Sequence, residues 1–298
     1  MTRKTGFTLI ELLMVVMIIV VLIALLVPVL RAAREHGRRV VCLGNLRNLQ
    51  VAWHAYANDY SGDLVYCRSW QPTYGIPRGK KPWLFGFALP KQPVDLSMKT
   101  PWANIVKQGA LWPYVGKLEI YGCPATPKQL RITTDVQTTG DTKNAVIPIR
   151  VSYSIAISTG TDRPLEEFTI LPEPHEGGGS PLYVSNIQRF KNSPAGSRMV
   201  FVCEGDLRVA YSVAFQEPRW HSPPPIYHSE GTSYAFADGH SEYYKWADSR
   251  SQKTGELARD DFAHYIEARD GDVAFSPGNE DLVWVQKRVW GKLGYDPN

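Results

Sequence analysis

The chain has 298 residues, of which 44% are hydrophobic, and a formal net charge of +4. The excess positive charge lies near the N-terminus, because residues 1–30 carry +1 and residues 31–48 carry +4, which leaves −1 for residues 49–298. This distribution excludes an extended basic surface on the larger part of the chain, and nucleic acid is not an expected partner. The length after residue 62 can bury a sizeable core, and one large domain with insertions is expected rather than two.

An apolar run extends from Phe7 to Leu30 and contains one charged residue, Glu11. At about 1.5 Å per residue, a helix of this length can cross the hydrocarbon core of a bilayer, which is about 30 Å thick. A carboxylate inside that core is costly unless it has a partner. We therefore expect residues 7–30 to form a transmembrane helix and Glu11 to have a designated partner. Pro28 marks a point where this helix can kink or loosen.

Two simpler interpretations of this segment are a plain signal anchor and a cleaved secretory signal peptide. A secretory peptide has a shorter apolar core that is followed by a small-residue cleavage site, whereas this run ends in Leu30-Arg31-Ala32-Ala33-Arg34. A plain anchor requires neither Gly6 nor Glu11. The flanking charges alone favour a cytoplasmic C-terminal part, because five arginines follow the run by position 47 and only two basic residues precede it.

Residues 31–62 are expected to continue the helix outside the membrane as an amphipathic half. Apolar residues recur every three or four positions, at Leu46, Leu49, Trp53, Tyr56 and Tyr60. This spacing predicts one buried helix face, and Ser61-Gly62-Asp63 is a stop signal. The arginines of this segment are expected either to contact anionic lipid headgroups or acidic neighbours, or to form a solvated helix face.

Residues 63–298 are rich in proline, glycine, tryptophan and tyrosine, with short β-prone runs between turn-rich segments. The clearest runs are 147–157, 199–203 and 207–215, and a closing helix is expected around 255–269. The fold class is therefore α+β, with a long N-terminal transmembrane helix that continues into a β-rich antiparallel head domain.

Asp238-Gly239 lies between two alternating runs and predicts a two-residue type I′ hairpin, in which both central residues adopt positive φ. In that register Tyr234 lies opposite Tyr243, and Phe236 shares their buried face.

Four residues near this hairpin carry groups that first-row metals accept as ligands. They are His221, His228, Asp238 and His240. Their spacing is not a zinc pattern, and a hydrogen bond between a histidine and an aspartate that stabilises the turn is the preferred interpretation. We assign no metal ligand, no cofactor and no catalytic residue, and the sequence has no Gly-x-Ser-x-Gly motif.

Two acidic segments, Asp270-Gly271-Asp272 and Asn279-Glu280-Asp281, lack EF-hand spacing and are interpreted as turn residues rather than calcium ligands.

The four cysteines, Cys42, Cys67, Cys123 and Cys203, all follow the apolar run. Sequence allows three full disulfide pairings and does not choose among them. If unpaired, Cys203 is interpreted as a buried core thiol.

The residues Lys4-Thr5-Gly6-Phe7-Thr8-Leu9-Ile10-Glu11-Leu12-Leu13 resemble the processing site of type IV prepilins and of type II secretion pseudopilins. The resemblance implies a leader of residues 1–6, which prepilin peptidase removes by cleavage at the Gly6 carbonyl. Phe7 then becomes the N-methylated terminus, and Glu11 neutralises the terminal amine of a neighbouring subunit during assembly. It also implies a cytoplasmic leader and an exported head, opposite to the orientation that the flanking charges favour.

A second resemblance lies in the head, where nine residues separate His228 from Asp238-Gly239. This pattern resembles a group of prepilin-type proteins abundant in planctomycetes and their relatives. The segment from Leu111 to Pro124 is similar to one common in that group, while the intervening insertions are unmatched.

These features together predict a non-enzymatic pseudopilin or minor pilin subunit in the inner membrane. It spans the membrane once, and its head is periplasmic or extracellular after assembly. The expected partners are prepilin peptidase, other pilin or pseudopilin subunits and inner-membrane lipid. The alternative is a membrane-tethered polysaccharide-binding surface protein with an aromatic-rich head, which exposed coplanar aromatic rings would favour.

Overall fold

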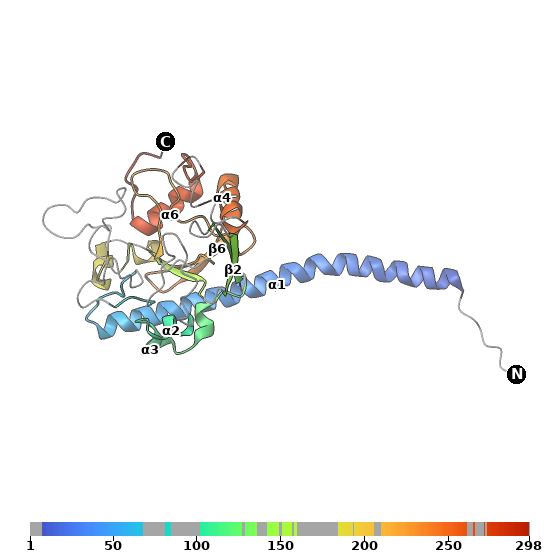
Figure 1. The fold of residues 1–298 in the computed structure, drawn as a ribbon, viewed down its shortest axis with the longest axis horizontal. Helices are drawn as coiled ribbons and strands as arrows, with labels where there is room; N and C mark the ends of the chain where they lie inside the picture. The colour runs from blue at the N-terminus through green and yellow to red at the C-terminus, as the bar shows by residue number, and fades with distance from the viewer. Residues whose placement is uncertain are drawn as a thin grey trace.

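The computed structural model describes residues 8–67, 81–84, 102–126, 129–135, 142–148, 151–156, 158–159, 184–192, 194–205, 210–260, 265, 271 and 273–297. A single long helix, α1 (Leu9–Asp59), projects from a head in which the other described elements gather (Figure 1). The N-terminal end of α1 lies far from the head, and its C-terminal part runs along the head. The expected combination of a long apolar helix and an α+β head is confirmed.

Helix α1 is continuous over 51 residues and includes Pro28 in its interior. The expected stop is confirmed, because the helix ends at Asp59 and both Ser61 and Gly62 adopt positive φ, at 55° and 90°. One helix therefore joins the exposed apolar segment to the head.

The centre of the head is a five-stranded sheet with the order β5-β3-β4-β6-β7. Its strands are β3 (Tyr153–Ala156), β4 (Met199–Cys203), β5 (Ala210–Tyr211), β6 (Gly231–Phe236) and β7 (Ser241–Lys245). Strands β3, β4, β6 and β7 pair antiparallel, whereas β5 pairs parallel with β3 at one edge. The sheet is therefore mixed rather than wholly antiparallel.

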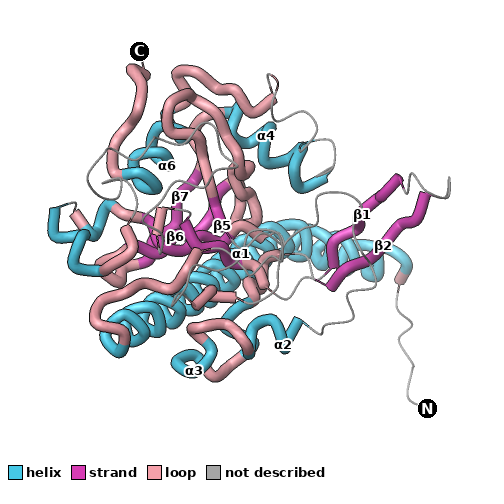
Figure 2. The backbone as a smooth tube through the Cα atoms, turned by 60° about the vertical axis from the view of Figure 1, so that its left-hand side comes forward, coloured by secondary structure: helices cyan, strands magenta, loops and turns pink. Residues whose placement is uncertain are grey.

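Helices cover both faces of this sheet (Figure 2). On one face the Arg39 guanidinium of α1 lies 3.8 Å from the centroid of the Tyr243 ring, and Ser241 Oγ donates to the Leu43 carbonyl at 3.3 Å. On the other face Tyr244 stacks on Trp284 of α6 (Glu280–Trp290), with ring centroids 3.9 Å apart. The second half of α1 is thus one outer layer of the domain.

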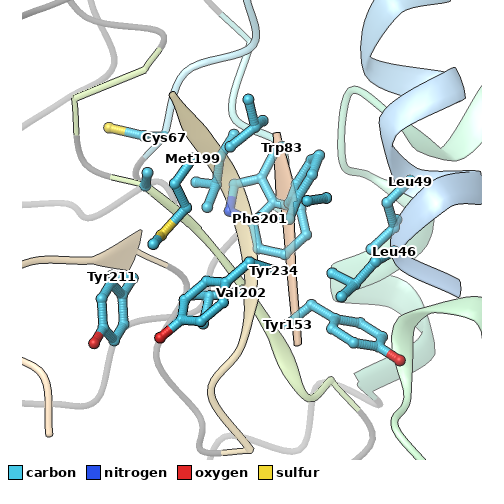
Figure 3. Close-up of a cluster of buried hydrophobic side chains, with 14 of the residues drawn as sticks. Leu46, Leu49, Cys67, Trp83, Tyr153, Met199, Phe201, Val202, Tyr211 and Tyr234 are labelled. Carbon is cyan, nitrogen blue, oxygen red and sulfur yellow. The ribbon is translucent and has the colours of Figure 1, made fainter. Parts of the chain in front are cut away.

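One part of the core lies between α1 and the sheet, and another lies on the face toward α6. Figure 3 shows Leu46 and Leu49 reaching from α1 toward a cluster that contains Trp83, Tyr153 and Phe201. All five side chains are fully buried. Burial of this apolar surface stabilises the head and fixes the helix against it.

Smaller elements surround this core. They are α2 (Trp102–Lys107), α3 (Trp112–Val115), η1 (Leu118–Tyr121), η2 (Ile187–Asn192), η3 (Ala195–Ser197) and α4 (Ser249–Asp260). Strands β1 (Gln129–Asp135) and β2 (Thr142–Pro148) form a separate antiparallel ribbon.

The predicted strand at 199–203 coincides with β4. The run at 147–157 includes the last residues of β2 and all of β3, while residues 149, 150 and 157 lie outside the described residues. In the run at 207–215, residues 210–211 form β5, and residues 207–209 lie outside the described residues.

The closing helix begins before the expected position, and a second helix, α6, follows it. The expected range 255–269 overlaps α4 at residues 255–260, and Tyr265 is also helical, while residues 261–264 and 266–269 lie outside the described residues. Helix α4 begins at Ser249, where Asp248 Oδ1 accepts from the Arg250 N–H at 2.8 Å, and it ends at Asp260. Gly255 lies inside α4, and its lack of a side chain allows the Pro224 carbonyl to approach, since a Cβ there would collide with that carbonyl. Helix α6 was not expected at all.

Candidate functional site

The described part of the segment that resembles a processing site, residues 8–13, lies at the start of α1. Gly6 and Phe7 lie outside the described residues. Thr8 is the N-cap of α1, and its hydroxyl accepts from the Glu11 N–H at 3.3 Å. In return, Glu11 Oε2 accepts from the Thr8 N–H at 2.8 Å and from the Thr8 hydroxyl at 2.7 Å. This reciprocal arrangement is a capping box, so Glu11 has a partner within its own chain.

The first half of α1 is apolar on every side. All its large hydrophobic side chains from Leu9 to Leu30 are exposed in the isolated chain. Among the described helices, α1 alone is long and apolar enough to cross a membrane, judged by length and composition. A helix that is apolar all round and unburied by its own protein requires another apolar environment.

The second half of α1 is buried along the predicted stripe. Leu46, Leu49, Trp53 and Tyr56 are at most 3% exposed, whereas Tyr60 is 40% exposed and stacks on Tyr56. The prediction is therefore confirmed for four of its five residues.

The basic segment that follows the apolar run divides into two parts. Arg31, Arg34, Arg38 and Arg47 are exposed. Arg39 is half-buried, and its guanidinium packs on the Tyr243 ring. A cation over an aromatic face is favourable, so Arg39 has a structural role in joining α1 to β7.

The hairpin at Asp238-Gly239 exists, but its loop has three residues rather than two. The Phe236 N–H donates to the His240 carbonyl at 3.0 Å, and the Gly239 N–H donates to the Phe236 carbonyl at 2.9 Å. Gly239 has a φ of 96°, whereas Asp238 is not among the described residues with positive φ. This is a tight turn followed by a left-handed glycine, the usual geometry of a three-residue hairpin loop, and the type I′ prediction is wrong.

The extra loop residue shifts the register. Tyr234 pairs with Glu242, and Tyr243 pairs with Ser233. Because neighbouring positions alternate between faces, Tyr243 lies on the face toward α1, and the predicted pairing of Tyr234 with Tyr243 is wrong. The prediction that Tyr234 and Phe236 are buried is confirmed, since both are 0% exposed.

The histidine and aspartate of the turn are His240 and Asp238, whose Nδ1 and Oδ1 lie 2.5 Å apart. His228 lies elsewhere, although its backbone is tied to the hairpin because its carbonyl accepts from the Tyr243 hydroxyl at 2.7 Å. Within the described residues, His221, His228, Asp238 and His240 do not form a common metal-ligand group.

The acidic segment at 279–281 begins α6. Asn279 caps the helix by accepting from the Leu282 N–H at 3.1 Å. Asp281 accepts from the Tyr244 hydroxyl and from two backbone N–H groups. The interpretation of 279–281 as turn residues is therefore wrong, because these residues cap and begin a helix, while Asp270 and Asp272 lie outside the described residues.

A different cluster lies between α1 and the sheet. Cys42 projects from α1, Cys123 follows η1, Cys203 ends β4 and His228 precedes β6. All four residues are buried, and their ligand atoms lie within 4.8 Å of one another. Segments that are far apart in the sequence therefore converge on one small site.

His228 is oriented by contacts at both ring nitrogens. Its Nε2 lies 3.2 Å from Cys123 Sγ and 3.8 Å from Cys203 Sγ. Its Nδ1 lies 3.1 Å from Glu35 Oε1. Glu35 and Cys42 are seven residues apart on α1, about two helical turns, so they share a helix face.

The four groups differ in their preference for charge. Burial raises the pKa values of the Cys42 and Cys203 thiols. Hydrogen bonds from these two thiols lower the pKa of Cys123. Burial alone would lower the pKa of His228, but the contacts with Cys123 and Glu35 outweigh it and raise that pKa. The site therefore favours a thiolate at Cys123 beside the imidazole.

All four cysteines fall within the described residues, and none of them forms a disulfide there. Cys67 is buried in the main hydrophobic core, and it does not belong to the cysteine and histidine cluster. The interpretation of Cys203 as a buried thiol is confirmed, but the sequence did not indicate its neighbours.

The described aromatic residues of the head are mostly core residues. Trp53, Trp83, Trp220, Trp246 and Trp290 are at most 1% exposed. Among the described aromatic side chains, only Tyr60 and Phe275 are strongly exposed. Within the described part of the head this pattern favours core packing over a sugar-stacking platform.

Comparison with family models, with curated proteins and with solved structures finds no match to this chain.

Sequence reasoning missed the cysteine and histidine cluster because its members have no local spacing. His228 is 105 residues from Cys123 and 25 residues from Cys203. Zinc motifs that can be recognised in a sequence combine pairs of ligands with two to five residues between them. The available signals were the cysteine next to Pro124 and the histidine of the His-x9-Asp-Gly pattern, which had each been noted separately.

Proposed function

We propose that this protein is a pseudopilin or minor pilin subunit of a type II secretion or type IV pilus-like filament. Prepilin peptidase cleaves after Gly6 and methylates Phe7, residues 7–30 hold the subunit in the inner membrane, and the head is exported. The observation that carries the proposal is the division of α1. Its first half exposes only apolar side chains apart from Glu11 and the small polar N-cap, and its second half is built into the core of the head. A filament subunit needs both halves in one helix.

The contacts of Glu11 are compatible with this role. Cleavage after Gly6 leaves the Thr8 N–H in a peptide bond with Phe7, so the capping box persists in the mature chain. The Glu11 carboxylate is exposed in the isolated subunit. It can therefore hold its own helix start in the monomer and pair with the terminal amine of a neighbour in the filament.

A second exposed apolar surface lies on α1 beyond the membrane segment. Outside residues 9–30, the strongly exposed large hydrophobic residues of the described chain are Val40, Val41, Val51, Tyr60 and Phe275. Val40 and Val51 are about three helical turns apart and share a face. Such a face is consistent with helix packing between subunits, because burial of exposed apolar side chains against a neighbouring helix removes apolar surface from water and is favourable.

The test separates the charge of Glu11 from its capping role. Glu11→Gln preserves the capping box, because glutamine also serves at this position, but removes the charge. Thr8→Ala removes the capping hydroxyl and keeps the carboxylate. Each full-length variant is expressed in a bacterium with its own prepilin peptidase and filament system, and sheared filaments are probed for the subunit.

We expect the wild-type N-terminus to be N-methylated Phe7 by mass spectrometry, and Glu11→Gln to be cleaved normally but lost from filaments. Thr8→Ala should enter filaments. An intact Met1, a cut after Leu30, or equal incorporation of Glu11→Gln and wild type would contradict the proposal.

A further inference from the structure

We propose that the buried cluster of three cysteines and one histidine binds a single Zn²⁺ ion that fastens α1 to the sheet. The proposed ligands are Cys42, Cys123, Cys203 and His228. The site is independent of the filament role, because none of its residues belongs to the processing segment or to the membrane-spanning half of α1.

The donor set matches zinc. Three thiolates and one imidazole are a common ligand set of structural zinc sites, which are closed and tetrahedral. Soft sulfur ligands select zinc or Cu(I) over magnesium and calcium. All four side chains are at most 6% exposed, so no solvent-open position remains for a substrate. The arrangement therefore indicates a structural site rather than a catalytic one.

The spacing also matches zinc. Bond lengths of about 2.3 Å for Zn–S and about 2.0–2.1 Å for Zn–N in a tetrahedron place a sulfur and a nitrogen about 3.5 Å apart. The two distances from His228 Nε2 to sulfur, 3.2 and 3.8 Å, lie on either side of this value. Small adjustments of side chains would complete the coordination.

The orientation of His228 supplies a second, independent observation. A metal-bound imidazole usually donates its other ring N–H to a carboxylate or a carbonyl, which fixes the ring and its tautomer. Glu35 provides such a carboxylate at 3.1 Å from Nδ1, while Nε2 points at the sulfur atoms. Glu35 and Cys42 come from the same helix, so α1 would supply both a ligand and the group that orients another ligand.

A bound ion explains why these groups are buried together. Cys42 belongs to α1 and Cys203 to the central sheet, while Cys123 and His228 lie in two segments outside the helices and strands. A metal would join all four segments at one point, and its binding free energy would contribute directly to the stability of the folded head. It would also protect the three thiols from disulfide formation in an oxidising compartment.

The experiment measures metal in the full-length protein, purified in detergent under reducing conditions and without metal-affinity resin. Elemental analysis should find one zinc per chain. Cys123→Ser and His228→Ala should reduce it to less than a tenth, whereas the matched control Cys67→Ala, a buried cysteine outside the cluster, should retain it. Replacement by Co²⁺ should give the absorption of a tetrahedral thiolate site.

Variants that replace one ligand by another keep the test informative if the deletion variants fail to fold. His228→Cys should still bind one zinc, because four thiolates are also a zinc site. Wild-type protein that takes up no zinc after reduction and addition of Zn²⁺ would overturn the proposal. So would a disulfide among the three cluster cysteines that persists under reducing conditions, copper in place of zinc, or zinc content that none of the ligand variants lowers.

Discussion

Asp281 is a buried acidic residue whose removal should cost considerable stability. It is 0% exposed and lies in the first turn of α6. Its carboxylate accepts from the Tyr244 hydroxyl at 3.0 Å, the Ala247 N–H at 3.1 Å and the Asp248 N–H at 2.8 Å. It therefore ties the start of α6 to the end of β7 and to the segment before α4.

The magnitude follows from these three bonds. A hydrogen bond to a charged group contributes about 1.5–3 kcal/mol, so three would contribute about 5–9 kcal/mol if every donor lost its partner completely. The donors are only partly buried, and water can replace part of the lost bonding. We therefore expect Asp281→Ala to reduce the free energy of unfolding by about 3–5 kcal/mol.

The assay is urea denaturation of the full-length protein in mild detergent, followed by tryptophan fluorescence. Trp284 stacks on Tyr244 and should report the loss. The matched control is Glu280→Ala, an exposed acid in the same turn, which should change stability by less than about 0.5 kcal/mol. Asp281→Asn should be intermediate, because the amide keeps one acceptor oxygen. A loss below about 1 kcal/mol for Asp281→Ala would refute this reasoning.

Three further predictions concern the hairpin, the core and the cluster. Gly239→Val should destabilise the head by about 1–3 kcal/mol in the same assay, because a β-branched residue is unfavourable at a φ of 96°. Gly239→Asn should cost less. Equal stability of the valine variant and wild type would contradict the loop geometry. Burial raises the pKa of Tyr56 to about 12, above the value of about 10 expected in the unfolded chain. The stabilising contribution of the neutral Tyr56 hydroxyl is therefore complete below pH 10 and is lost as the pH rises toward 12. In the Tyr56→Phe variant the free energy of unfolding should fall less steeply with pH in that range, and the same slope as in wild type would contradict this prediction. Glu35→Gln should weaken zinc binding about 10–100-fold in competition with a chromogenic chelator, and unchanged affinity would mean that Glu35 does not orient His228.

Helix α1 could be predicted from sequence because its determinants are local. The apolar run, the three-and-four spacing from Leu46 to Tyr56 and the stop after Asp59 each need only neighbouring residues. The pattern Thr8-x-x-Glu11 also identifies a capping box in the sequence itself. The Glu11 carboxylate was instead interpreted only as a partner for the terminal amine of a neighbouring chain, so the capping box was not predicted.

Other features depended on choices that local patterns leave open. Asp-Gly suits both a two-residue and a three-residue loop, and only the observed bond from Phe236 to His240 decides between them. Helix α6 carried an N-cap at Asn279, acids in its first turn and Gly291 after its end, but the acidic triplet was interpreted as a turn.

The cysteine and histidine cluster depends on long-range topology. Cys42 meets Cys203 only because α1 packs on the face of the sheet toward which Cys203 points. The pairing of β4 with β3 and β6 determines which residues of β4 face α1. No spacing of residues in the sequence indicates this pairing. The convergence follows from the fold and not from any segment alone.

The burial of α1 in the head also determines how the protein bears mechanical load. Tension on the apolar end of α1 acts along the helix axis, parallel to the surface that the helix shares with the sheet. Contacts at Cys42, Leu46, Leu49 and Trp53 are then strained together rather than one after another. A sideways pull would instead break these contacts one after another, so we expect axial extraction of α1 to require more force than peeling it from the sheet.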